Sequence, residues 1–303
     1  RYTAFVKKLL LDKCDYDYCV FDHNSIAGTL VQYVNKFNIS TITINHNHEP
    51  EYFKTTTSNC LLRILFPPVI RRQEKKAYRN SKINFFLTMN DLKIFAEKYG
   101  KNNAHNEVIG CFESSESEQC LTICKKTKAT NRFIISGSLS SNQNCITIKN
   151  FFKKYYLLLP SQSTITIAGK HPSEGIKNLC RLYPNVELVP NPVDMKKIIS
   201  QADIYICPIE IGGGLKLRIM DGLRNGLPVL AHKNAARGYD MFFDKEWFQI
   251  YDDENSFLQA LDRITCYIQT NDYLIQSIMK EYFKYFSYES GKGKIYSCLL
   301  NRN

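Results

Sequence analysis

The stretch Ile204–Leu230 reads IYICPIEIGGGLKLRIMDGLRNGLPVL and decides the fold. Its apolar runs predict short buried strands at Ile204–Cys207 and Val229–Ala231. Three consecutive glycines, Gly212–Gly214, lie between these strands and are followed by a helical pattern. Bare glycine amides let a ligand approach the backbone closely, and a helix that starts there points its positive dipole end at a bound anion. The stretch predicts a strand–loop–helix–strand unit with a diphosphate cradle, although a glycine-rich turn can also be no more than a tight connection.

Charged residues after the glycines favour the diphosphate. Lys216 and Arg218 are expected in the first turn of the helix, where a cation is unfavourable to the dipole but helps to bind a polyanion. Asp221 lies one turn later, within reach of a ribose hydroxyl, as in nucleotide-binding βα units. Gly226 and Pro228 then end the helix and start the next strand.

The motif GGGLKLRIMDGLRNGLPVL resembles the C-terminal nucleotide-sugar site of glycosyltransferase family 4. The resemblance extends upstream through Ala202–Ile204, Pro184–Glu187 and Ile134–Leu139, and downstream to Gly238. It implies an α/β protein of the GT-B type, with two Rossmann-like domains, parallel sheets and an active site in the cleft between them. It also implies an enzyme that transfers a sugar from a nucleotide-diphosphate sugar to a glycan or lipid-linked acceptor, with retention of anomeric configuration.

The resemblance places the donor at the strand ends of the second domain, with two departures from the family pattern. Ser138 stands where the family often has an arginine, so that Lys216 or Arg218 must neutralise the phosphates. The first acid of the family's E-x7-E pair would fall at Gly213 and is missing, and Glu210 is the nearest substitute. For Lys170, an ordinary surface lysine is the favoured alternative to a donor contact. The residues assigned to the donor are Gly137, Ser138, Lys170, Val189, Pro190, Glu210, Gly212, Gly213, Gly214, Leu215, Lys216 and Asp221.

No Asp-x-Asp metal motif accompanies these residues. We therefore expect the charge of the leaving group to be stabilised by amides, the helix dipole and Lys216, with no metal and no cofactor other than the donor substrate itself.

A polar loop in the first half is expected to face the acceptor. The strand Thr41–Ile44 runs into Asn45–Pro50, which contains His46, His48 and Glu49. Open α/β sheets bind ligands at the carboxyl ends of their strands, so all three are placed where reactive groups are expected. The resemblance implies that this loop lines the acceptor side of the cleft, and His46 therefore joins Lys216 as a candidate catalytic group. Local hydrogen bonding by the imidazoles is the alternative. Metal binding by the His-x-His pair lacks a second ligand cluster.

The composition fits a chain of two domains. The 303 residues have 44% hydrophobic content, and no apolar run is long enough to span a bilayer. The net charge of +11 suits a polyanionic partner, and peripheral association with an anionic membrane is more natural here than nucleic acid binding. Eleven scattered cysteines predict free thiols in a reducing compartment. We expect a cytoplasmic protein, for which peripheral association with the inner face of the membrane is an option.

We expect an acceptor-side domain at residues 1–125 and a donor-binding domain at 126–303, joined by the polar segment Glu113–Lys128. The first domain offers about four strands where the family usually has six or seven. Either about ninety residues are absent or the domain is reduced, and we favour the absence of residues because a half-sheet would leave an unpaired edge. Four local features are also expected: a long helical stretch at Tyr52–Tyr78 interrupted at Pro67 and Pro68, an Asn90 cap on the helix Leu92–Tyr99, a short strand at Val108–Gly110, and two or three helices in Glu254–Leu300.

Two other functions stay open. An epimerase acting on a nucleotide sugar would share the architecture but needs carboxylate acid–base pairs, of which the sequence offers few. A non-catalytic anion-binding protein would fit the basic charge and the missing first acid.

Overall fold

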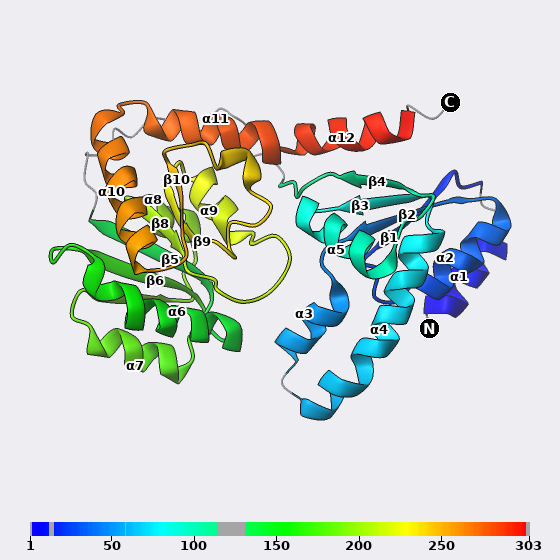
Figure 1. The fold of residues 1–303 in the computed structure, drawn as a ribbon, viewed down its shortest axis with the longest axis horizontal. Helices are drawn as coiled ribbons and strands as arrows, with labels where there is room; N and C mark the ends of the chain where they lie inside the picture. The colour runs from blue at the N-terminus through cyan, green and yellow to red at the C-terminus, as the bar shows by residue number, and fades with distance from the viewer. Residues whose placement is uncertain (1, 12–14, 58, 114–130, 301–303) are drawn as a thin grey trace. The chain divides into compact units, whose positions relative to one another are not determined.

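Every paired strand among the described residues is parallel to its neighbours, and the strands form two separate sheets. This computed structural model describes residues 2–11, 15–57, 59–113 and 131–300 (Figure 1). The chain divides into a first unit, Arg1–Cys111 with Gly213–Leu215, and a second unit, Phe112–Gly212 with Lys216–Asn303. The predicted domain boundary and most of the predicted connection lie outside the described residues.

The first unit contains a four-stranded sheet in the order β1-β2-β3-β4. The β-branched and aromatic runs that predicted strands form β2 and β3, and these are its most buried strands. Its elements are α1 (Tyr2–Leu11), β1 (Tyr18–Asp22), α2 (Ala27–Val34), the 3₁₀ helix η1 (Asn35–Phe37), β2 (Ser40–Asn45), α3 (Glu49–Thr56), α4 (Cys60–Asn80), β3 (Ile83–Phe86), α5 (Met89–Tyr99) and β4 (His105–Val108).

The second unit contains a six-stranded sheet in the order β10-β9-β8-β5-β6-β7. The chain starts in the middle at β5, moves out through β6 and β7, then returns beside β5 and moves out the other way. Its strands are β5 (Arg132–Ser138), β6 (Thr164–Lys170), β7 (Val186–Pro190), β8 (Ile204–Cys207), β9 (Val229–His232) and β10 (Phe248–Tyr251). Its helices are α6 (Asn142–Tyr155), η3 (Tyr156–Leu158), α7 (Glu174–Leu182), α8 (Met195–Ser200), α9 (Arg218–Arg224), η4 (Asp240–Phe242), α10 (Glu254–Thr270), α11 (Leu274–Phe286) and α12 (Tyr288–Leu300).

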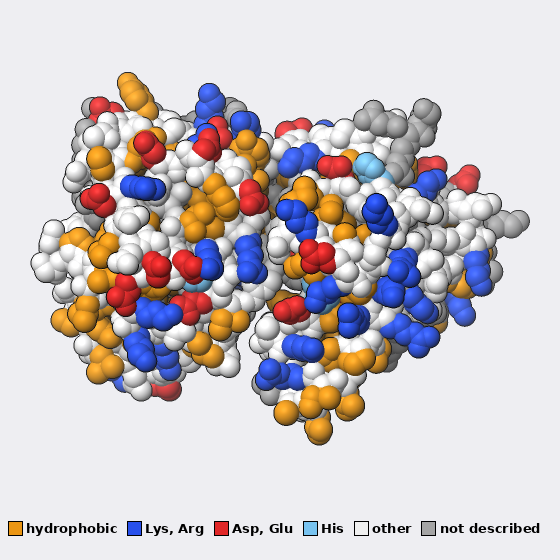
Figure 2. Space-filling view, in the orientation of Figure 1, with side chains coloured by type: hydrophobic (Ala, Val, Ile, Leu, Met, Phe, Trp, Pro, Cys, Tyr) orange, Lys and Arg blue, Asp and Glu red, His pale blue; other side chains and the backbone are white. Residues whose placement is uncertain are grey.

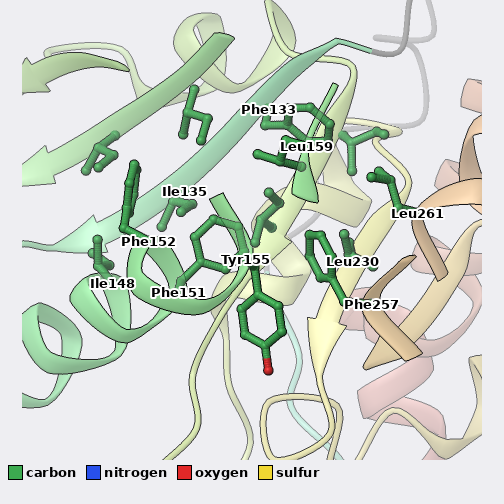
Figure 3. Close-up of a cluster of buried hydrophobic side chains, with 14 of the residues drawn as sticks. Phe133, Ile135, Ile148, Phe151, Phe152, Tyr155, Leu159, Leu230, Phe257 and Leu261 are labelled. Carbon is green, nitrogen blue, oxygen red and sulfur yellow. The ribbon is translucent and has the colours of Figure 1, made fainter. Parts of the chain in front are cut away.

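Aromatic side chains from α6 and α10 form the core on one face of this sheet (Figure 3). Phe151 and Tyr155 of α6 meet Phe257 of α10, with ring centroids 6.0 and 4.9 Å apart. α9 packs against β8, β9, α8 and α11. A sheet covered by helices in this way explains why β8 and β9 are buried at every position and apolar at all of them except His232. The predicted architecture of two Rossmann-like α/β domains is confirmed.

Three local predictions were wrong. α4 continues through Pro67 and Pro68 without a break. Thr88, rather than Asn90, caps α5, because its side-chain oxygen accepts from the Asp91 amide. β4 ends at Val108 instead of running on to Gly110.

The cysteines that the structure describes carry free thiols. Cys207 and Cys180 are buried, and burial raises the pKa of both thiols, that of Cys207 to about 11. Within the described part of the chain, no helix combines the length and the hydrophobicity that crossing a bilayer requires.

Candidate functional site

The switch point of the second sheet lies between β5 and β8, which are neighbours although the chain leaves them in opposite directions. Open α/β sheets bind ligands in the crevice that such a reversal creates at the carboxyl ends of the strands. β5 ends in Gly137 and Ser138, and β8 leads into the loop that carries the three glycines. The two segments with the strongest donor prediction therefore follow the two strands that flank the switch point.

Arg218 places its guanidinium against Gly137. A Cβ atom added to Gly137 would overlap the guanidinium carbon of Arg218, so only glycine leaves room for this side chain. Gly137 also has a φ of 141°, in the region that favours glycine. A Cβ atom on Gly169, at the end of β6, would in turn overlap the Gly137 carbonyl oxygen. The two glycines let the strand ends and one cation approach closely.

This contact supplies the positive charge that Ser138 lacks. From the sequence we assigned Lys216, and not Arg218, to the donor and catalytic residues. Both side chains were expected in the first helical turn. α9 begins at Arg218, so Lys216 lies in the preceding loop, and that expectation was wrong for Lys216. The helix has seven residues, so its dipole is smaller than that of a long helix. The side chain of Arg218 is the better-placed cation at the end of β5.

The glycine loop has backbone conformations that require glycine. Gly212 and Gly214 have φ values of 101° and 71°. The Gln143 side chain of α6 donates to the Ile211 carbonyl, and a Cβ on Gly212 would overlap that amide nitrogen. Tyr239 donates to the Lys216 carbonyl over 2.9 Å. Bonds to both ends of the loop therefore hold its conformation.

Ser138, Lys170 and Pro190 lie along one edge of the sheet, as predicted from their strand ends. Ser138 pairs with Lys170, and Gly169 pairs with Pro190. Ser138, Lys170 and Pro190 are exposed, while Val189 and Leu215 are half-buried.

Asp221 takes part in an ion-pair network. It accepts from Arg224 over 3.0 Å, and Arg224 donates to Glu113 over 2.6 Å. Tyr282 of α11 donates to the same Glu113 oxygen over 2.6 Å. Burial raises the pKa of Asp221, and the positive charges of Arg224 and Arg218 oppose this. The network joins α9 to α11, and binding of ribose by Asp221 stays a prediction.

Glu210 belongs to a polar cluster after β8, β9 and β10. Asn150 donates to one of its oxygens over 2.9 Å and Lys154 to the other over 3.1 Å. Burial alone would raise the pKa of Glu210, but these two donors outweigh it and the pKa is lowered. His232, which ends β9, is buried, and its pKa is lowered for that reason. Its Nδ1 accepts from the Asn234 amide over 3.2 Å, so in the neutral ring Nε2 carries the proton and faces Asp252.

In the first unit, the ends of β1 and β2 bring His46 to His23. Their rings stack with centroids 4.0 Å apart and planes inclined by 18°. His46 Nε2 lies 2.6 Å from Asp22 Oδ1, and His23 Nδ1 lies 3.5 Å from Glu49. His23 has a φ of 78°, which is uncommon for a residue with a side chain. We missed His23 and Asp22 in the sequence; the signal was their position after the strand preceding that of His46.

Asp22, His23 and His46 also form a candidate metal triad, with one ligand atom each within 4.8 Å of the others. Nearly parallel stacked rings cannot both direct an in-plane lone pair at one ion, so we assign no metal to this group.

His48 lies away from this stack, in a buried network around Glu74. Glu74 of α4 has an exposed fraction of 0% and accepts from Asn24, the Glu49 amide and Tyr99 over 3.1, 3.0 and 2.7 Å. Burial raises the pKa of Glu74 to about 7. Burial also lowers the pKa of His48 to about 4, with Lys98 adding to the effect. The predicted acceptor loop thus supplies one half-buried histidine and one buried histidine.

Comparison with known proteins agrees with this geometry. The family model described as "Glycosyl transferases group 1" matches residues 130–265. No curated protein matches the chain by sequence. Anabaena HepE, in a crystal structure with UDP, is 14% identical to this protein in sequence, and the two structures superpose with a TM-score of 0.68. The alignment covers 98% of this chain and 82% of the HepE chain. A glycosyltransferase from Rickettsia africae is also 14% identical, with a TM-score of 0.65 and coverages of 99% and 81%.

The pneumococcal O-GlcNAc transferase GtfA, in complex with UDP and GlcNAc, is 15% identical with a TM-score of 0.62. That alignment covers 98% of this chain and 58% of GtfA. The structural similarities establish the fold, and the residues matched by the family model include Gly137, the glycine loop and Arg218. Residues 130–265 match the group 1 glycosyltransferase model, and the chain has the two Rossmann-like domains of the GT-B fold.

Proposed function

We propose that the protein transfers a sugar from a UDP-sugar to a glycan or lipid-linked acceptor. UDP is the nucleotide named for HepE and for GtfA, and a further HepE structure holds UDP-glucose. The proposal rests on one observation: Arg218 lies on Gly137 at the switch point of the second sheet. A guanidinium in this position can bind the oxygens of a diphosphate with two parallel hydrogen bonds.

The proposed chemistry follows from the charge that develops on the leaving group. As the glycosidic bond breaks, negative charge accumulates on the departing diphosphate. Arg218, Lys216 and the amides after Gly212 would stabilise that charge, so the site's own residues supply this stabilisation without an added cation. Retention of configuration and a lipid-linked or glycan acceptor are part of the same proposal, as is work at the cytoplasmic face of a membrane.

The test is binding of UDP to variants of the phosphate site, measured by titration calorimetry. Arg218→Gln should weaken binding by about 10- to 150-fold, which corresponds to loss of a hydrogen bond to a charged group. Gly137→Ala should weaken it similarly, because the new methyl group displaces the guanidinium. Lys216→Ala should have a smaller effect.

Arg181→Gln is the matched control, because Arg181 lies on α7 and donates to the neighbouring Asn178. ADP and GDP report the choice of base. If Arg218→Gln binds UDP as tightly as the unaltered protein, the phosphate site lies elsewhere and the proposal fails.

A further inference from the structure

The first ten residues of α4 expose a large apolar surface. We call this segment, Cys60–Val69, the α4 tip. Its exposed hydrophobic side chains, with their exposed fractions, are Leu61 (70%), Leu62 (37%), Ile64 (66%), Leu65 (63%), Phe66 (48%) and Val69 (59%). Monomeric proteins rarely leave that many neighbouring large apolar side chains in water unless the surface has a partner.

The α4 tip is a formed helix. Asn59 caps it by accepting from the amides of Leu61 and Leu62 over 3.0 and 3.2 Å. Phe66 stacks on Phe53 of α3 with ring centroids 5.9 Å apart. The spacing of Leu61, Ile64 and Leu65 places them on one side of the helix. The apolar surface is therefore presented by a capped helix that its neighbour supports.

Positive charge borders this surface. α4 carries six basic residues and a single acid, Glu74, which is fully buried. Exposed cations of the same two helices are Lys54 on α3 and Arg63, Arg71, Arg72 and Lys75 on α4. Figure 2 shows hydrophobic side chains gathered at the free end of α4, with Lys and Arg side chains beside them. The surface combines an apolar end with a cationic border.

This combination of apolar and cationic side chains fits an anionic lipid bilayer, whose interior is apolar and whose surface is negatively charged. Interfacial helices bury an apolar surface about 5–10 Å deep at the boundary between headgroups and acyl chains, while Lys and Arg bind the anionic headgroups. A second copy of the chain is a poorer occupant, because it carries the same net charge of +11 and the same cationic border.

We propose that the α4 tip docks this protein on an anionic phospholipid bilayer. Leu61, Ile64 and Leu65 enter the headgroup–acyl boundary, and Arg71 and Arg72 bind lipid phosphates. The helix rests in one leaflet, in keeping with the absence of a membrane-spanning helix among the described residues. The inference rests on the part of the proposed function that places the protein at a membrane, and its test is separate from that of sugar transfer because it involves residues of the first unit only.

Vesicle flotation tests the proposal. The full chain should float with vesicles of phosphatidylcholine and phosphatidylglycerol, and poorly with phosphatidylcholine alone. Leu61→Glu with Leu65→Glu should weaken binding by about 100-fold or more, since two leucines no longer leave water. Arg71→Gln with Arg72→Gln should weaken it by about 30-fold, because each cation near an anionic surface contributes roughly fivefold.

Matched controls change two exposed leucines or two exposed cations in the second unit. Leu157 and Leu182 are 88% and 75% exposed, so Leu157→Glu with Leu182→Glu adds equal charge to an exposed apolar surface elsewhere. Lys153→Gln with Lys197→Gln removes two exposed cations. Both control pairs should bind vesicles as the unaltered protein does. Circular dichroism and UDP titration check that every variant is folded.

Three results would overturn the proposal. The first is that the unaltered protein does not float with anionic vesicles. The second is that the α4 tip variants float as well as their controls. The third is that light scattering detects a dimer that the Leu61 and Leu65 substitutions dissociate, because a second copy of the chain would then cover the tip. A loss of UDP binding with vesicle binding intact would affect only the proposed sugar transfer.

Discussion

Two buried titratable residues of the first unit have pKa values shifted in opposite directions. The pKa of Glu74 is raised to about 7 and that of His48 is lowered to about 4, in both cases mainly by burial. Folded protein therefore holds the Glu74 proton up to about pH 7, whereas unfolded chain releases it near the ordinary value of 4.5. Stability from this group falls as pH rises from about 4.5 to 7. For His48 the unfolded chain binds the extra proton, so stability rises from about pH 4 to 6.5.

The two contributions should largely cancel in the unaltered protein, and single substitutions should separate them. Glu74→Gln keeps an acceptor for Asn24 and removes the falling contribution. Relative to the unaltered protein, its free energy of unfolding should increase by about 2–3 kcal/mol between pH 4.5 and 7. His48→Gln should show the opposite trend over the same range. Urea unfolding at several pH values measures both.

The double variant is the control, because it removes both groups and should follow the pH dependence of the unaltered protein. Parallel curves for all four proteins would show that neither pKa is shifted as the burial of these side chains requires.

Arg218 shows what the sequence left open at the level of single residues. The glycine triplet and the positive charges after it predicted a donor site within a few positions of Arg218. The choice between Lys216 and Arg218 depended on where α9 begins and on which side chain Gly137 admits, and neither is visible in a local pattern. His23 was missed for a similar reason, since it meets His46 only because β1 and β2 are paired.

At the level of elements, apolar runs predicted the strands of the second sheet well, because strands buried on both faces are mostly apolar. The predicted break in α4 was wrong. Prolines 67 and 68 lack an N–H, so the carbonyl groups one turn earlier lose their helical donors. Those carbonyls belong to Arg63 and Ile64, which are exposed, so water can bind them and the helix continues.

Two helical glycines, Gly28 and Gly293, distinguish the effect of helix propensity on stability from the effect of packing. Gly28 of α2 is buried against α4, and a Cβ there would overlap the Gln73 carbonyl oxygen and lie 2.7 Å from Lys76 Cβ. Gly293 of α12 has no atom within 4 Å of an added Cβ. Gly28→Ala should therefore destabilise the protein by about 1–3 kcal/mol through overpacking. Gly293→Ala should stabilise it by up to about 1 kcal/mol.

Thermal and urea unfolding of the two variants measure this difference. Helix propensity alone predicts stabilisation by both substitutions, so a gain in stability for Gly28→Ala would contradict the close α2–α4 packing.

On the scale of the whole molecule, the order of short motifs predicted two Rossmann-like domains and sugar transfer, because βαβ rhythm and strand-end chemistry are local in sequence. Pairings between distant segments were not predictable in this way. The link from Asp221 through Arg224 to Glu113 and Tyr282 joins residues that are 169 positions apart at its widest. Such contacts require the folded chain.

The stereochemistry of the reaction decides what His46 does. In an inverting displacement the acceptor hydroxyl loses its proton to a base, and His46, held by Asp22 over 2.6 Å, would be that base. Its loss would then cost about 10²–10⁴-fold in rate. In a retaining transfer the diphosphate leaves from the face that the acceptor attacks, so its oxygen can take the proton. We expect retention, and therefore a rate loss of about tenfold or less for His46→Gln.

Transfer from UDP-glucose to methanol, followed by proton NMR, measures both quantities at once, because a methyl glycoside keeps its anomeric configuration in water. An α-glycoside formed at a similar rate by the unaltered protein and by His46→Gln would agree with the proposal. A β-glycoside whose formation is abolished by His46→Gln and also by Asp22→Asn would instead make the Asp22–His46 pair the base of an inverting enzyme. Slow release of glucose without methanol, absent in Arg218→Gln, separates either enzyme from a protein that only binds UDP, because a binding protein has no means of stabilising the departing diphosphate in the transition state.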